Sequence, residues 1–84
     1  MKVAKFVSWT EDGSKLVIVN ALTRKGIILD DTGKMIWDQI LRGSDKEEII
    51  KQCVAQFPDS DIQVIRNDIE DCISVLLEND IVQM

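Results

Sequence analysis

The chain has 84 residues, of which 45% are hydrophobic and 30% charged, and its formal net charge is −5 at pH 7. A chain of this length buries only about 60 to 65 percent of its unfolded surface, which leaves little room for an enclosed active site. The composition is that of a folded globular protein and excludes a disordered one. We therefore expect residues 1–84 to form a single domain.

Two features of the sequence bear on its compartment. No apolar run approaches the roughly 18 residues that a membrane span needs, and no secretory apolar core follows Met1. We therefore expect a cytoplasmic protein with no membrane partner. Cys53 and Cys72 lack CxxC spacing, and the chain has no histidine to complete a metal site. Buried reduced thiols are favoured over a disulfide.

The first 29 residues predict three short antiparallel strands in a meander. Residues 3–9 alternate imperfectly between apolar and polar, and the Asp12-Gly13 pair that follows is a hairpin signal. Residues 16–19 and 27–29 are apolar runs separated by a turn. Because the third strand shows no polar alternation, both of its faces need cover, and its outer edge needs a partner.

Helical periodicity begins directly after this strand. Asp30 or Asp31 is predicted to cap a first helix, which Arg42-Gly43 ends. Ser44 and Glu47 predict a capping box for a second helix, which ends before Pro58. Because the strands precede the helices, the fold class is α+β, a three-stranded antiparallel sheet followed by three helices.

The third helix, predicted from about residue 61 to residue 78, has an unusually wide apolar surface. At 100 degrees per residue its apolar positions sweep roughly 220 degrees, whereas covering one core needs only about 100 degrees or somewhat more. Part of this surface therefore has a second neighbour or awaits a partner. Asp68 lies inside the apolar arc. Ile81 and Val82 are predicted either to form a last short strand or to pack against the core.

The residues that usually carry catalysis are missing. The sequence has no histidine, no tyrosine and no glycine-rich phosphate loop, and its adjacent carboxylates are better explained as helix caps or solvated surface. We predict no enzyme activity and no cofactor. Residues 35–84 carry a net charge of −7, and Arg66 is the one cation of the third helix, so nucleic-acid binding is disfavoured.

Two segments, "LDDTGKMIWDQILRGSDKEEIIKQC" and "VIRNDIEDCISVLLENDIV", resemble the PqqD-like family, the precursor peptide recognition elements of ribosomally made, post-translationally modified peptides. The chain departs from the family pattern at Asp30-Asp31, where Asn-Pro or Asn-Glu is common, and at Asn79-Asp80, where a glycine is usual. The features that carry the resemblance, in order along the chain, are Leu29, Thr32-Gly33, Ile36-Trp37, Gly43-Ser44, Asp68-Ile69, Leu76 and Ile81-Val82.

The resemblance implies a winged helix-turn-helix-like trio of helices after the sheet and a role in binding the leader segment of a precursor peptide. In this family the leader adds as a strand beside the third strand and lies against the third helix. The core segment is then presented to a modifying enzyme, such as a radical S-adenosylmethionine enzyme or a leader protease. The products of such systems include lasso peptides and coenzyme PQQ.

On this interpretation, the pairing edge is Gly26, Ile27, Ile28 and Leu29, and the apolar anchors are Ile65, Ile69 and Cys72. Asp68 would accept a hydrogen bond or ion pair from the leader, and Lys25 beside Arg24 would attract its acidic residues. For each of these residues the alternative is a purely structural role. A different function, a homodimerisation module that pairs its free strand edge with a second copy, also remains open at this point.

Overall fold

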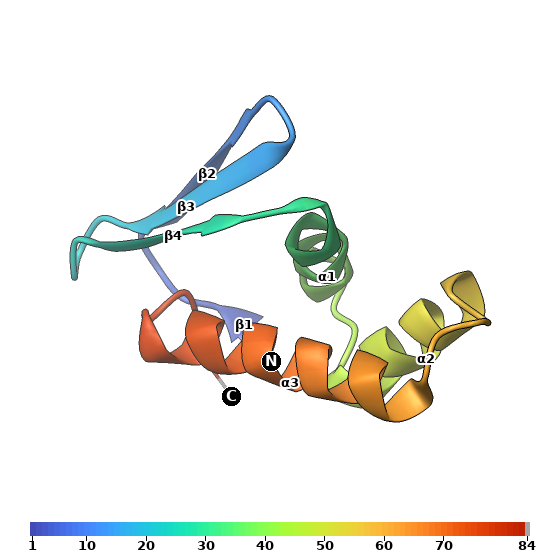
Figure 1. Cartoon of the computed structure of the whole chain (residues 1–84). Coiled ribbons are helices and arrows are strands. Elements are labelled where there is room, and N and C mark those ends of the chain that lie inside the picture. Colours follow the sequence, from blue (N-terminus) through green and yellow to red (C-terminus); the bar gives the residue numbers. More distant parts are fainter. Residues whose placement is uncertain (84) are drawn as a thin grey trace.

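The sheet consists of three antiparallel strands. The computed structural model describes residues 1–83 and contains β2 (Val7–Asp12), β3 (Lys15–Asn20) and β4 (Lys25–Leu29) in the spatial order β2-β3-β4 (Figure 1). Asp12 pairs with Lys15 around a two-residue turn in which Gly13 has φ of +62°, a conformation that favours glycine. The predicted hairpin and the α+β class are confirmed.

The prediction of a single strand over residues 3–9 is wrong. The segment is divided into β1 (Lys2–Val3) and β2. Phe6 lies between them with φ of +65°, which takes the chain out of the extended conformation. β1 leaves the sheet and pairs antiparallel with β5 (Val82–Gln83), with Val3 opposite Val82. The last short strand, one of the two predicted options for Ile81 and Val82, therefore forms, shifted by one residue.

Three helices follow the sheet. In α1 (Asp31–Leu41), Asp30 is the N-cap and its carboxylate accepts a hydrogen bond from the Gly33 amide at 3.0 Å. The capping box of α2 (Lys46–Gln56) is formed by Asp45 and Glu48, which corrects the predicted pair Ser44 and Glu47 by one residue. Both registers offer an oxygen-bearing residue followed three positions later by glutamate, so the sequence alone does not separate them. The Ser44 hydroxyl instead donates to Gln39 Oε1.

One hydrophobic core joins the sheet to the helices. Leu16, Ile18 and Leu29 of the sheet pack with the buried side chains of α1, α2 and α3 (Ile62–Glu78). Trp37 of α1 is buried and meets the ring of Trp9 edge-on, with ring centroids 5.2 Å apart. Within residues 1–83, no helix is long and apolar enough to cross a bilayer.

Candidate functional site

The outer edge of β4 is the first component of the site. β3 pairs with β4 on one side, and no strand of residues 1–83 pairs with its other side. Ile27 lies opposite Ile18 and Leu29 opposite Leu16, so these two side chains share the core face of the sheet. Ile28 lies on the other face and is 67% exposed. β4 is thus anchored through alternate residues while its edge stays open.

The second component is a stripe along α3. Ile65, Ile69, Ile73 and Leu76 are buried in the core, and they account for the part of the apolar surface that one core needs. Beside them lies a stripe that the core leaves exposed, except for the half-buried Cys72, which packs against the core. The members of this stripe recur every three or four residues and so share one side of the helix: Val64, Asp68, Asp71, Cys72 and Val75.

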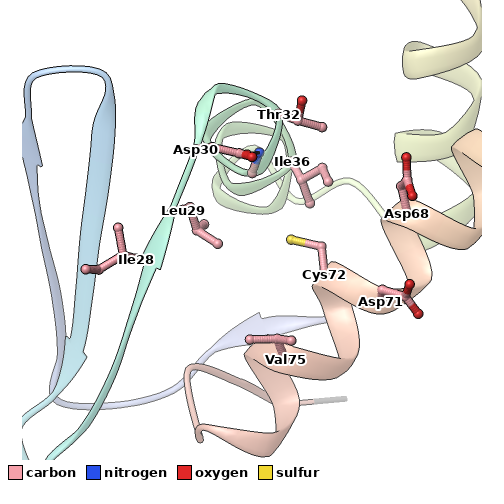
Figure 2. A pocket seen from close by; sticks show the side chains of 10 residues that line it. Ile28, Leu29, Asp30, Thr32, Ile36, Asp68, Asp71, Cys72 and Val75 are labelled. Carbon is pink, nitrogen blue, oxygen red and sulfur yellow. Dashed lines mark hydrogen bonds between the residues drawn. The ribbon is translucent and has the colours of Figure 1, made fainter.

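The β4 edge and this stripe face each other across a groove of about 420 Å³ (Figure 2). The first turn of α1 closes one end of the groove, because β4 runs into α1 almost without a loop. The Cys72 thiol points from α3 toward the junction of β4 and α1. The groove is lined by Ile28 and Leu29 of β4, by Asp30, Thr32, Gly33 and Ile36 at the start of α1, and by Asp68, Asp71, Cys72 and Val75 of α3.

Gly33 fixes how closely α1 approaches the end of β4. A Cβ atom added at Gly33 would lie 2.8 Å from Leu29 Cβ and 3.1 Å from Leu29 Cδ2. Leu29 is itself held in the core at 8% exposure, so it has little room to move aside. The Thr32-Gly33 step therefore has a physical purpose, which is to let the first helical turn pack onto the last residue of β4.

The groove has a negative electrostatic character. Asp30, Asp68 and Asp71 line it, and none of the three forms an ion pair with a cation within residues 1–83. Burial, and secondarily the charge of Asp30, raises the pKa of the Cys72 thiol to about 11. A ligand entering the groove therefore meets a protonated thiol and three carboxylates rather than a nucleophile.

The predicted site residues fall into three groups. Leu29, Asp68 and Cys72 come together in the groove, and Ile28 lines it while its side chain points away from α3 (Figure 2). Ile65 and Ile69 are 8% and 1% exposed, pack in the core and do not line the groove.

At the other end of β4, the side chains lie outside the groove. Gly26 is exposed and Ile27 is half-buried against the core. The Lys25 ammonium donates to the Glu78 carbonyl and lies 3.3 Å from an Asp80 carboxylate oxygen, so it fastens the start of β4 to the end of α3.

Six groove residues were missed by the sequence reasoning: Asp30, Thr32, Gly33, Ile36, Asp71 and Val75. Two of them were accessible from the sequence, because Asp71 and Val75 lie three residues after Asp68 and Cys72 and so extend the same side of the helix. The other four depend on how α1 packs on β4, which helical periodicity does not reveal.

The comparisons with known proteins agree with this architecture. Residues 15–82 match the family model described as coenzyme PQQ synthesis protein D (PqqD). The chain belongs to the PqqD family. Among curated proteins, none matches it.

A solved structure described as "TbiB1 in Complex with the TbiA(beta) Leader Peptide" is similar to this PqqD-family chain with a TM-score of 0.86 and 23% sequence identity, covering 99% of this chain and 95% of that one. The two therefore share a fold over nearly their whole lengths. The resemblance to PqqD-like proteins and the fold that it implied are confirmed.

Proposed function

We propose that this protein binds the leader segment of a ribosomally made precursor peptide, which adds as a strand to the free edge of β4 and lies against α3. The observation that carries the proposal is the open β4 edge facing the uncovered stripe of α3 across the groove. Exposed edges are usually blunted or covered in natural proteins, and an extended peptide is a recurrent way of covering one. The structurally similar TbiB1 was solved with a leader peptide.

The expected affinity follows from the length of the edge. β4 has five residues, so a leader gains about four to six backbone hydrogen bonds at about 1 kcal/mol net each. Ordering a free peptide costs about 2 to 5 kcal/mol or more, which leaves little surplus. One or two buried apolar side chains, at about 1.5 to 3 kcal/mol each, then set the affinity. We expect a Kd between micromolar and high nanomolar.

The protein's own role is to hold the leader while another protein performs the chemistry. The leader contacts that we assign are the backbone of β4 and the side chains of Ile28, Leu29, Asp68 and Cys72. A peptide-modifying enzyme, such as a radical S-adenosylmethionine enzyme or a leader protease, would act on the core segment that emerges from the groove. The groove carries carboxylates and a protonated thiol, which suits binding better than nucleophilic catalysis.

A titration tests the proposal. The probe is the leader of any precursor peptide that the neighbouring genes encode, synthesised with fluorescein at its N-terminus, and the readout is fluorescence anisotropy. Tryptophan emission is a poorer readout, because neither Trp9 nor Trp37 lines the groove. Val75, which is 41% exposed in the groove, is changed to lysine, and Leu41→Lys on α1, 44% exposed and outside the groove, is the matched control.

We expect saturable binding by the wild-type chain and by Leu41→Lys, and binding at least tenfold weaker by Val75→Lys. A leader that shows no saturable response with the wild-type chain would sink the proposal. Equal affinities of the two lysine variants would place the leader somewhere other than the groove.

Strand addition has its own signature. In an antiparallel or parallel pair, only alternate residues of the added strand point their N–H groups at β4. Single N-methylation along the leader should therefore weaken binding at every second position over about five residues and have little effect between them. A helical docked leader would instead be disrupted at most of its methylated positions, and this pattern would reject strand addition.

Dimerisation through β4 is the competing use of the same edge. If two copies pair there, sedimentation at increasing concentration shows a dimer that the leader dissociates. A dimer whose stability the leader does not change would mean that the leader and the β4 edge do not meet, which contradicts the proposal.

A further inference from the structure

A second cavity adjoins the groove and has no part in the proposal above. It has a volume of about 210 Å³ and lies between α1, the C-terminal end of α2 and the N-terminal half of α3. Phe57 and Val64 at this cavity are 44% and 54% exposed, so it is open to solvent. Most of its lining is apolar: Met35, Cys53, Phe57, Val64, Ile65 and Ile69.

This cavity shares part of its wall with the groove. Thr32 and Asp68 line both of them, so a ligand that leaves the groove past the first turn of α1 reaches the second cavity next. On α3 the same stripe serves both: Val64, Asp68 and Cys72 are spaced by four residues and share one side of the helix. The part of the α3 surface that the core does not need thus runs along both the groove and the second cavity.

We propose that the second cavity is an anchoring subsite for the same leader and accepts one large apolar side chain, such as that of leucine or phenylalanine. This inference rests on the proposed function and adds a sequence requirement to the leader. An apolar cavity of about 150 Å³ is enough to hold benzene, so a cavity of about 210 Å³ fits such a side chain.

The position of the subsite explains why it is needed. β4 ends at Leu29 and α1 begins at Asp31, so beyond that point the leader has no strand edge with which to form backbone hydrogen bonds. Side-chain burial is then the interaction that remains available to it. Cys53, Ile65 and Ile69 form a buried floor, and exposed Phe57 and Val64 form the rim.

The geometry also predicts the spacing of the two anchors in the leader. Eight residues of α3 separate Val64 from Cys72, which is about 12 Å along a helix. An extended peptide spans this distance in roughly three to four residues. The apolar anchor of the second cavity should therefore lie about four residues away from the leader side chain that rests on Cys72.

Two lysine substitutions on the same turn of α3 test the subsite. Val64→Lys places a charge at the rim of the second cavity. Ile62→Lys is the control, since Ile62 is equally exposed at 58% but lines neither the cavity nor the groove. With the fluorescein-labelled leader we expect Val64→Lys to bind about tenfold weaker than wild type and Ile62→Lys to bind within twofold of it. Val64→Ala should weaken binding in the same direction but less.

An alanine scan of the leader completes the test. Changing one apolar leader residue to alanine should weaken binding to the wild-type chain but not to Val64→Lys. The reason is that the alanine substitution and Val64→Lys remove the same contact. If Val64→Lys and Ile62→Lys bind alike while Val75→Lys is defective, the second subsite is overturned and the proposed function stands. If the wild-type chain binds no leader, both fall.

Discussion

At the scale of single residues, the reactivity of the Cys72 thiol can be used to probe the groove. The thiol is half-buried in the groove, and its charged form is disfavoured first by burial and then by the nearby charge of Asp30, so its pKa is raised to about 11. Only the thiolate reacts with alkylating agents, so reactivity requires a pH near that value. The leader would cover the thiol when it occupies the groove.

We predict that the rate of Cys72 alkylation by iodoacetamide rises about tenfold per pH unit between pH 8 and pH 10 without reaching a plateau. In the urea-unfolded chain the rate should level off near pH 9, the ordinary range of a thiol. Mass spectrometry of the Cys72 peptide gives the rates, and saturating leader should slow them in the folded chain. A plateau below pH 9.5 in the folded chain would contradict the raised pKa.

Asp68 bears on the charge of the leader. It lies where the groove meets the second cavity, and Asp30 and Asp71 add to the negative charge there without a partner among the cations of residues 1–83. A leader carrying a lysine or arginine at this point gains an ion pair, and exposed pairs of this kind contribute about 0.2 to 1 kcal/mol.

We therefore predict that Asp68→Asn weakens leader binding by roughly two- to fivefold at low salt. The difference should shrink at 0.5 M NaCl, because salt screens exposed charges. Asp59→Asn, in the loop before α3 and outside both cavities, serves as the control in the same anisotropy titration. Tighter binding by Asp68→Asn would indicate an anionic or apolar leader residue instead.

At the scale of the elements, the sequence predicted most boundaries because caps and turns are local. Asp30, Gly13 and the Arg42-Gly43 stop act through their own backbone and immediate neighbours, and the structure has them as predicted. Phe6 was missed, since a non-glycine residue at positive φ has no signal in the sequence. The positive φ of Phe6 divides a segment that the sequence pattern predicted as one strand.

The site was predicted less completely, because it depends on packing between elements. The excess width of the α3 surface correctly indicated an uncovered side, but periodicity cannot say which side of a wide arc faces the core. The structure buries Ile65 and Ile69, and it leaves open Val64, which is next to Ile65, and Val75, which is next to the buried Leu76. The contribution of α1 to the groove follows from its contact with Leu29, a tertiary feature.

Gly33 allows that contact to be tested. The Gly33→Ala substitution adds a Cβ atom that would sit 2.8 Å from Leu29 Cβ, so α1 or β4 must shift. Overpacking of this kind typically costs about 1 to 3 kcal/mol, although alanine favours a helix by up to about 1 kcal/mol. We predict a net loss of stability in urea unfolding and weaker leader binding. Thr32→Ala, at an exposed position of the same turn, should change stability by less than about 0.5 kcal/mol. Unchanged stability of Gly33→Ala would show that the turn is loosely packed.

At the scale of the whole molecule, the sheet and the helices share one core, so we expect them to unfold together. Leu16, Ile18 and Leu29 are buried with residues of all three helices, and β1 pairs with β5 so that the chain ends of the described region are joined as well. The groove lies across this junction, with β4 on one side and α3 on the other. A leader that binds both sides therefore stabilises the folded molecule as a unit.

The size of this stabilisation can be predicted from mass action. A ligand that binds only the folded state at 100 times its Kd stabilises it by about 2.7 kcal/mol. For a domain of about 60 to 100 residues, 1 kcal/mol shifts the Tm by about 4 to 8 °C, so we predict a rise of roughly 10 to 20 °C.

Differential scanning calorimetry at a fixed leader concentration measures this rise, with a scrambled leader as the control. Val64→Lys should keep the Tm of the free chain, because Val64 is exposed, but it should reduce the rise that the leader causes. A leader that saturates in anisotropy yet leaves the Tm unchanged must bind the unfolded chain equally well, which is incompatible with a site built from both β4 and α3.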